Sequence, residues 1–197
     1  MQAAPRLALI AACLALCVEP ARANWKPVEK VETYAISGAT GIDLYRSIGE
    51  KGPKIGVGRA IAYTDFDLKW SRDYRPQPDG SCTLVTARPH VIITYRLPKP
   101  AGALPAATKA RWDAFIAGIT AHEKVHGEMI VDLVKAIEAV SVGLTAADDR
   151  KCQKVRADLQ SKLGPLSQAQ RARSRAFDQE EMSNGGNVHQ LILALVN

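Results

Sequence analysis

Hydrophobic and polar positions divide the chain into a strand-like first half and a helical second half. β-Branched and aromatic residues are frequent in 28–37, and hydrophobic and polar residues alternate through 62–70 and 91–97, as in half-buried strands. Gln77-Pro78-Asp79-Gly80 separates the last two segments and predicts a turn. We therefore expect the two alternating strands to pair antiparallel.

Helices are expected on either side of these two strands. Thr40 can cap a short helix that stops at Gly52-Pro53, before the first alternating strand. Prolines at 98, 100 and 105 precede a long helix over about 106–140, which Gly143 ends. Strands followed by helices predict an α+β fold.

Two further helices are expected towards the C-terminus. Thr145 can cap the first, which holds Cys152, Val155 and Leu159 and is ended by Gly164-Pro165. The second covers 167–182 and ends before a glycine-rich turn. The apolar tail 191–196 is too short to span a bilayer, and we expect it to dock on the core, with a partner contact as the alternative.

The long helix carries one continuous apolar face, and two histidines lie on it. Its members follow one another at three- and four-residue steps: Trp112, Phe115, Ile119, His122, His126, Met129 and Leu133. Two imidazoles one turn apart on a buried face are costly unless their nitrogen atoms find partners. A metal ion supplies such a partner.

His122, Glu123 and His126 form the motif H-E-x-x-H. Residues i and i+4 of a helix lie on the same side, so both imidazoles can bind one zinc ion while Glu123 projects beside it. Zinc lowers the pKa of a bound water, and the carboxylate can then take its proton as the water attacks a carbonyl carbon. The motif therefore predicts a zinc hydrolase, and a peptidase above all.

Two other interpretations of the motif stay open. In the first, the histidines are ordinary residues at the edge of the core, and Glu123 is a solvated neighbour paired with Lys124 or with nothing. In the second, the site binds zinc without turning over a substrate, because catalysis needs three protein ligands and an open fourth position.

The N-terminus predicts export. A positive start at Arg6, an apolar stretch over 7–18 and Ala21-Arg22-Ala23 before Asn24 are typical of a secretory signal peptide over residues 1–23. Residues 24–197 then form a single domain in the periplasm or outside the cell. Ile10-Ala11-Ala12-Cys13 also resembles a lipoprotein box, but cleavage there would leave an apolar mature terminus.

Removal of the signal peptide leaves two cysteines, Cys82 and Cys152. In an exported chain this number predicts one disulfide, with a pair of free buried thiols as the alternative.

The formal net charge of +6 is modest, and its excess lies largely in the second half, as in Arg171, Arg173 and Arg175. Two residues apart in a helix, these arginines do not share one face, and no aromatic residues alternate with them to stack on bases. We interpret them as a solvated surface, with contact to anionic envelope polymers as the weaker option, and expect no nucleic-acid partner.

These features together resemble a bacterial family of predicted secreted zinc-dependent proteases, catalogued as a domain of unknown function. The resemblance covers most of 28–183 and rests on the export signal, the strand-rich first half, the cysteines flanking the motif, and Trp112-x-x-Phe115 before His122-Glu123-Lys124-Val125-His126. It implies a zincin-like metallopeptidase with zinc as cofactor, His122 and His126 as ligands and Glu123 as general base.

The third zinc ligand is harder to find in the sequence. At the metzincin positions stand Met129, which continues the helix, and Asp132, which points away from the histidine face; Glu128 faces away too. A carboxylate from a later helix, as in gluzincins, fits better. We favour Asp178 over the other candidates, which are Asp148, Asp149, Glu180 and Glu181.

The remaining assignments are less specific. Tyr74, Tyr95 or His189 can stabilise the oxyanion formed on the attacked carbonyl, and His90 is interpreted as structural. The expected substrate is a peptide or protein, aligned by an edge strand near the motif helix. The rival functions are a non-catalytic envelope protein that binds zinc or a partner, and an amidase acting on cell-wall peptides.

Overall fold

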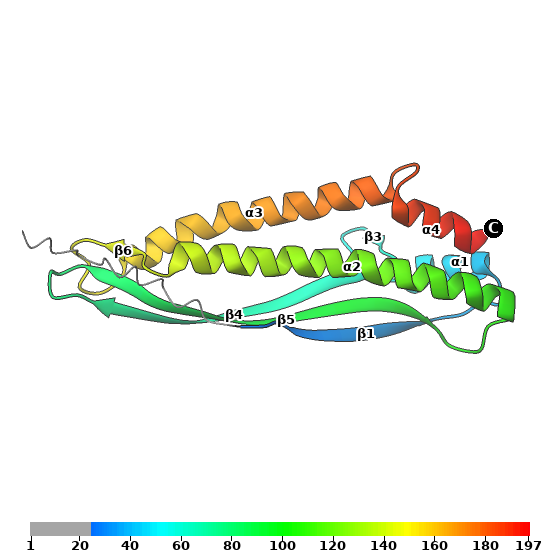
Figure 1. Ribbon diagram of the computed structural model, residues 1–197, viewed down its shortest axis with the longest axis horizontal. Coiled ribbons are helices and arrows are strands. Elements are labelled where there is room, and N and C mark those ends of the chain that lie inside the picture. Colours follow the sequence, from blue (N-terminus) through cyan, green and yellow to red (C-terminus); the bar gives the residue numbers. More distant parts are fainter. Residues whose placement is uncertain (1–24) are drawn as a thin grey trace, which may run out of the picture.

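A long antiparallel hairpin forms the base of the molecule (Figure 1). Its strands are β4 (Tyr63–Pro76) and β5 (Cys82–Pro100). The turn between them closes where the Gly80 N–H donates to the Gln77 carbonyl at 3.0 Å, and the φ of 85° at Gly80 favours glycine. The two predicted strands, their turn and their antiparallel pairing are confirmed, although both strands are longer than the alternation indicated.

The structure, a computed structural model, describes residues 25–197. The predicted signal peptide and the lipoprotein box at Cys13 lie outside these residues. Helix α1 (Gly41–Lys51) begins as expected, because the Thr40 hydroxyl accepts the Asp43 N–H at 3.3 Å.

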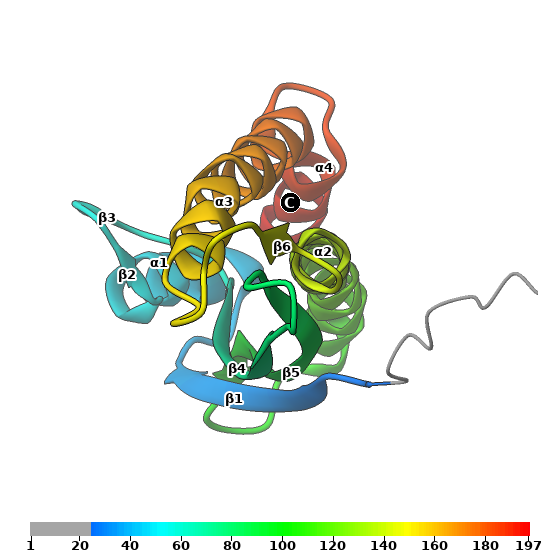
Figure 2. The ribbon, with the colours of Figure 1, turned by 90° about the vertical axis from the view of Figure 1, so that its left-hand side faces the viewer.

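The sheet is completed on both sides of β5. β1 (Val28–Ile36) pairs with β5 in parallel, so the main strand order is β1-β5-β4, and the short β6 (Thr145–Ala146) pairs with the start of β5. A separate small hairpin, β2 (Lys54–Ile55) with β3 (Gly58–Arg59), projects from the side of the molecule (Figure 2). In this arrangement β4 is an edge strand.

A bulge lets the β4–β5 hairpin serve two cores. Asp73 pairs with Thr86 and Tyr74 with Leu84, so Val85 is an extra residue on β5. A one-residue shift exchanges the two faces of a strand. Odd positions such as Ile93 and Tyr95 therefore face the main core, whereas even positions, Cys82 and Leu84, face a second core at the far end.

The helices lie above the sheet in two further layers. α2 (Ala106–Ser141) runs along the sheet, and its Trp112, Phe115 and Ile119 are buried in the main core. α3 (Lys154–Met182) returns antiparallel to α2 on its outer side, and α4 (Asn187–Val196) packs near the far end of α3 (Figures 1 and 2). The predicted α+β fold is confirmed.

Helix α3 corrects the prediction of two helices broken at Gly164-Pro165, because it continues through both residues. Proline lacks the N–H that would bond to the carbonyl of Ser161. Pro165 and Ser161 are both exposed, so water can hydrate that carbonyl and the helix continues.

The start of α3 also differs from the prediction. Thr145 does not cap a helix but lies in β6, and Cys152 precedes α3 with a φ of 56°. The cap is supplied by Asp149, whose carboxylate accepts the N–H groups of Gln153 and Val155 at 2.7 and 2.9 Å.

The apolar tail docks on the core, as expected. It forms α4, in which Val188 and Leu195 are buried. Leu191 packs against Gly118 of α2, where a Cβ would clash with the leucine side chain. No helix within residues 25–197 combines the length and apolarity that crossing a membrane requires.

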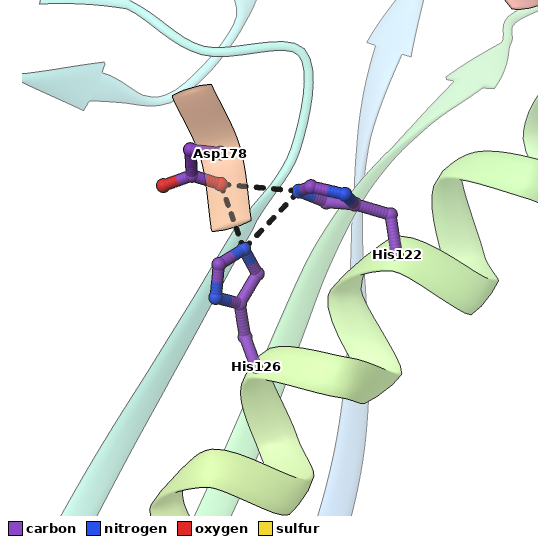
Figure 3. Close-up of side chains that lie close together, drawn as sticks. All are labelled: His122, His126 and Asp178. Carbon is purple, nitrogen blue, oxygen red and sulfur yellow. Dashed lines mark hydrogen bonds and ion pairs between the residues drawn. The ribbon is translucent and has the colours of Figure 1, made fainter. Parts of the chain in front are cut away.

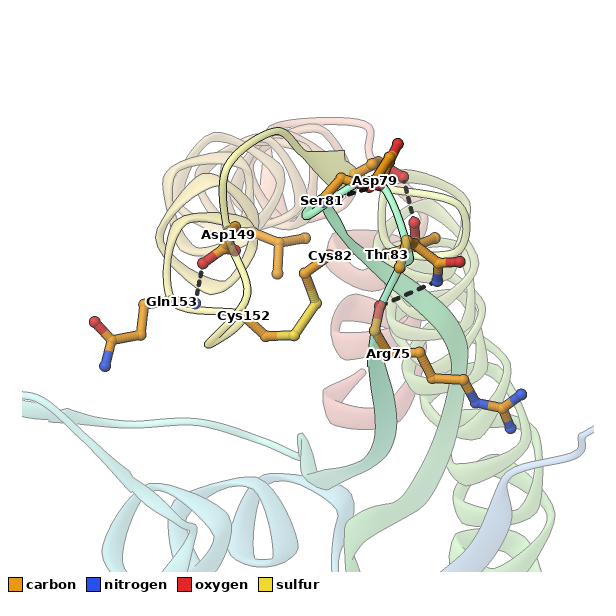
Figure 4. The surroundings of a disulfide bond; sticks show 11 residues. Arg75, Asp79, Ser81, Cys82, Thr83, Asp149, Cys152 and Gln153 are labelled. Carbon is orange, nitrogen blue, oxygen red and sulfur yellow. Dashed lines mark hydrogen bonds between the residues drawn. A yellow bond between two sulfur atoms is a disulfide. The ribbon is translucent and has the colours of Figure 1, made fainter.

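The predicted disulfide joins Cys82 to Cys152 (Figure 4). It lies in the second core with Leu84, Val155 and Leu159, beside the Asp149 cap. The bridge thus ties the first residue of β5 to the segment that leads into α3.

Removing the disulfide should destabilise the protein. Closing a loop of 70 residues contributes about 4 kcal/mol in the chain-entropy model, so Cys82→Ala/Cys152→Ala should lower the free energy of unfolding by about that amount in a urea titration. The wild type unfolded in reductant should show the same loss. Two free thiols in the untreated wild type would contradict the bridge.

Candidate metal centre

The two motif histidines lie one turn apart on α2, at the border between the core and a cleft. Each residue is only 8% exposed, and their ring centroids are 4.8 Å apart. Gly127 follows His126 where α2 crosses β5, and a Cβ at this position would clash with the Tyr95 hydroxyl. The missing side chain therefore lets the motif helix approach the sheet closely.

Asp178 reaches the same point from α3 (Figure 3). Its Oδ1 lies 3.2 Å from His122 Nε2 and 2.9 Å from His126 Nε2, and the two Nε2 atoms are 3.1 Å apart. The structure thus brings together three potential metal-ligating atoms from two helices that are far apart in sequence.

The size of this triangle fits a small tetrahedral ion. Zinc binds histidine nitrogen and carboxylate oxygen at about 2.0–2.2 Å, which places neighbouring ligand atoms about 3.3 Å apart in a regular tetrahedron. The observed separations of 2.9–3.2 Å are within a few tenths of an ångström of this spacing. An ion on the cleft side of the triangle would keep its fourth position open.

Hydrogen bonds alone leave the three atoms crowded. If both Nε2 atoms donate a proton to Asp178, their N–H groups lie side by side, with the two nitrogen atoms 3.1 Å apart. If only one carries a proton, the other nitrogen presents a lone pair to the carboxylate at 3.2 Å or less. A single cation between the three atoms removes this conflict.

The Nδ1 atoms of both histidine rings, which point away from Asp178, lie close to polar side chains of α3. His126 Nδ1 lies 2.9 Å from the Ser174 hydroxyl, which can accept its proton and leave Nε2 free to ligate. His122 Nδ1 is buried without a hydrogen-bond partner within residues 25–197, but Glu181 Oε2 lies only 3.6 Å away. Phe177 stacks on the His122 ring at 4.7 Å. Helix α3 therefore supplies both the candidate ligand Asp178 and the residues that contact the two histidine rings.

The pKa values of His122 and Asp178 depend on the charges of their neighbours. Burial alone would raise the pKa of Asp178, but its contacts with His122 and His126 hold that pKa well below the usual range. Burial lowers the pKa of His122, but Asp178 and Glu123 outweigh this effect and raise it overall. The site thus favours an ionised carboxylate beside positive charge.

Glu123 is buried beside the triangle, and a residue of β4 fixes its side chain. The Thr64 hydroxyl lies 2.6 Å from Glu123 Oε2 and 3.1 Å from the Glu123 carbonyl oxygen. Burial raises the pKa of Glu123, and the hydrogen bond from Thr64 opposes this shift. A carboxyl group with a raised pKa is suited to accepting a proton near neutral pH.

All these groups open into one cleft of about 760 Å³. Its walls are α2, α3, the first residues of β4 and the β2–β3 hairpin, and its lining includes His122, Glu123, His126 and Asp178. A cleft of this volume can take several residues of an extended peptide.

The comparisons with known proteins identify a family. The family model described as "Bacterial protein of unknown function (DUF922)" matches residues 31–186. The chain belongs to this family. No curated protein and no solved structure matches the chain.

All but one of the other candidate ligands of this DUF922 protein lie away from the histidines. Asp132 pairs with Arg173 at 2.8 Å, and Glu128 and Glu180 are exposed. Asp149 caps α3, and Asp148 lies near the disulfide with a φ of 50°. Of the acidic residues considered from the sequence, only Asp178 and Glu181 lie beside the histidines.

The residues considered for the oxyanion do not line the cleft. The Tyr95 hydroxyl donates to Glu29 at 2.8 Å, inside the contact between β1 and α2. The Tyr74 ring packs under Arg156 near the disulfide, and His189 accepts the Gly185 N–H. His90 lies on an exposed part of β5, with its Nε2 atom 3.1 Å from the Ser71 hydroxyl.

Sequence reasoning missed Thr64, Ser174 and Phe177 of this DUF922 protein. Ser174 stands four residues before Asp178, so its helical spacing was a usable signal, whereas Phe177, directly before Asp178, had no such signal. Thr64 had no such signal, because only the packing of β4 under α2 brings it to Glu123. Lys124, considered as a partner of Glu123, instead pairs with Glu29.

The contact between Ser174 and His126 predicts a difference in metal affinity. Ser174→Ala removes the partner of His126 Nδ1 and should weaken zinc binding about 10-fold or more, since loss of such partners typically costs 10–100-fold. Ser167→Ala, a change in the same cleft wall, is the matched control and should bind as the wild type does. Competition with a chromophoric chelator measures both; equal affinities would contradict the role of Ser174.

Proposed function

We propose that this protein is an exported zinc-dependent peptidase, with His122, His126 and Asp178 as zinc ligands and Glu123 as general base. The observation that supports it most is the meeting of two histidine nitrogens and a carboxylate oxygen within 3.2 Å of one another beside a buried glutamate. This set of ligand types, two imidazoles and one carboxylate, is the one that catalytic zinc uses in gluzincin-type sites.

The chemistry follows from the positions of the groups in the cleft. Zinc, when bound, supplies an acidified water and polarises the carbonyl of the scissile bond. Glu123 accepts the proton of the attacking water and passes it to the leaving amine, so the peptide bond breaks and a carboxylate and an amine form. Thr64 holds the carboxylate of Glu123 in place for both transfers.

The edge strand β4 is suited to align the substrate. It pairs with β5 on one side only, and its residues 63–66 line the cleft next to the motif. An extended peptide that pairs with this free edge would place its backbone beside Glu123 by strand addition. The free strand edge beside the motif supports a peptide over a small-molecule substrate. Cell-wall peptides, the substrates of the rival amidase, are also peptides and stay open as substrates.

Replacing the general base should separate zinc binding from catalysis. Glu123→Gln should keep zinc at the wild-type level, because Glu123 is not among the ligands, and should lower kcat by about 100-fold or more. Zinc content and cleavage of an unfolded protein such as casein are the two measurements.

The rivals predict other results for the same pair of proteins. A non-catalytic zinc protein shows full zinc content but no cleavage by the wild type, whatever peptide is supplied. Cleavage by Glu123→Gln at the wild-type rate would contradict the role of Glu123.

Thr64 offers a finer test of the proposed chemistry. Thr64→Val keeps the shape of the side chain but removes the hydroxyl, so the Glu123 carboxylate loses its donor and kcat should fall about 10-fold. Thr64→Ser keeps the hydroxyl and should stay close to the wild type. If valine and serine behave alike at this position, the hydrogen bond has no role in catalysis.

A further inference from the structure

Helix α3 forms one wall of the cleft, and this wall is largely polar although α3 packs along α2. Only Val155 and Leu159 of α3 are buried, and both lie near its start. From there on, the residues of α3 that line the cleft follow one another at helical spacing, and all except the last are polar or charged: Ser167, Gln170, Arg171, Ser174, Arg175, Asp178 and Met182. This face is not built to pack against apolar side chains.

Most charged residues around the cleft already have partners. Arg59 donates to the Gly52 carbonyl at 2.6 Å, and Asp65 pairs with Arg96 at 3.2 Å. Glu123 accepts from Thr64, and Asp178 contacts the histidines. Within residues 25–197, Arg171 and Arg175 alone among the charged lining residues have neither an ion pair nor a side-chain hydrogen bond.

These two arginines are one turn apart, so two like charges stand side by side on one helix face. Such a pair of like charges destabilises an isolated helix. Arg173, on another face of α3, is neutralised by Asp132 at 2.8 Å. Arg171 and Arg175 are exposed, in agreement with the expected solvated surface, but unlike Arg173 they line the cleft.

We propose that Arg171 and Arg175 bind a carboxylate of the peptide substrate and give this site a preference for acidic peptides. The inference rests on the proposed function, because it names the substrate class of the same cleft. A guanidinium binds a carboxylate through two parallel hydrogen bonds, which adds direction as well as charge. With an amide or an apolar side chain at that place, both exposed guanidinium groups are left to water.

The spacing on α3 limits where the carboxylate lies. Arg175 and Arg171 precede Asp178 by three and seven residues, which is about 4.5 and 10.5 Å along a helix axis. An extended peptide advances about 3.3 Å per residue. The acidic group therefore lies one to three residues from the scissile bond, as an aspartate or glutamate side chain or as the terminal carboxylate.

Binding of labelled peptides tests the inference without hydrolysis. The probes are three peptides of the same Ala-Ser-Gly background: one with glutamates and an amidated end, its glutamine twin with an amidated end, and the glutamine peptide with a free carboxylate. Fluorescence anisotropy is measured on zinc-loaded Glu123→Gln protein, so no probe is consumed.

We expect the glutamate peptide or the free-acid peptide to bind at least 10-fold more tightly than the amidated glutamine twin, and the better of the two identifies the source of the carboxylate. Adding Arg171→Ala/Arg175→Ala should abolish the difference. Lys162→Ala, which removes a charge from α3 outside the cleft, should keep it. Equal affinity for all three peptides would overturn the inference.

Cleavage by the wild type distinguishes this inference from the proposed function. In a digest of a complex peptide library, cleavage sites should be enriched in acidic residues on one side, and the double arginine variant should lose the enrichment while it still cleaves neutral peptides. Cleavage without acidic enrichment, together with equal affinities, sinks the inference and leaves the peptidase intact. Discrimination in binding without any cleavage leaves the anion site intact and removes the peptidase.

Discussion

Two imidazoles buried one turn apart on the same helix need a shared partner, and the arrangement of the helices follows from this need. His122 and His126 line the cleft with their Nε2 atoms 3.1 Å apart, and Asp178 Oδ1 lies 3.2 and 2.9 Å from them. Asp178 completes the set only because α3 returns along α2. A cation at this point would balance the charge of Asp178 and link the two helices.

The position of α3 depends on its ends more than on its middle. At its start, the disulfide, the Asp149 cap and the buried Val155 and Leu159 fix the helix to the second core. Near its other end, Phe177 stacks on His122, and α4 docks on α2 beyond it. The polar stretch between these anchors is left free to face the cleft. One helix thereby contributes both to the second core and to the wall of the cleft.

Local sequence patterns were sufficient to predict several helices and strands, and the part of the candidate site that lies on α2. The alternation in β4 and β5, the Thr40 cap and the apolar face of α2 are local signals, and each predicted its element. The prediction that a helix ends at Gly164-Pro165 was wrong, because the effect of a proline depends on its exposure, which the local sequence does not show. Asp178 could be placed among five acidic candidates, but its proximity to the histidines is a tertiary fact.

The supporting residues were beyond sequence reasoning for the same physical reason. Thr64 contacts Glu123 across a helix–strand packing that no spacing rule predicts, and the bulge at Val85 that turns Cys82 inwards is visible only in the register of the hairpin. Arg171 and Arg175 looked like surface charges because the sequence does not show the cleft that they line.

Metal content by mass spectrometry, measured on the mature protein after zinc loading and dialysis, tests the central claim most directly. We expect about one zinc per wild-type chain, retention of zinc in Asp132→Ala, which removes a carboxylate outside the site, and loss of zinc in both His126→Ala and Asp178→Ala. A wild type without zinc, or an Asp178→Ala protein that holds zinc as tightly as the wild type, would contradict it.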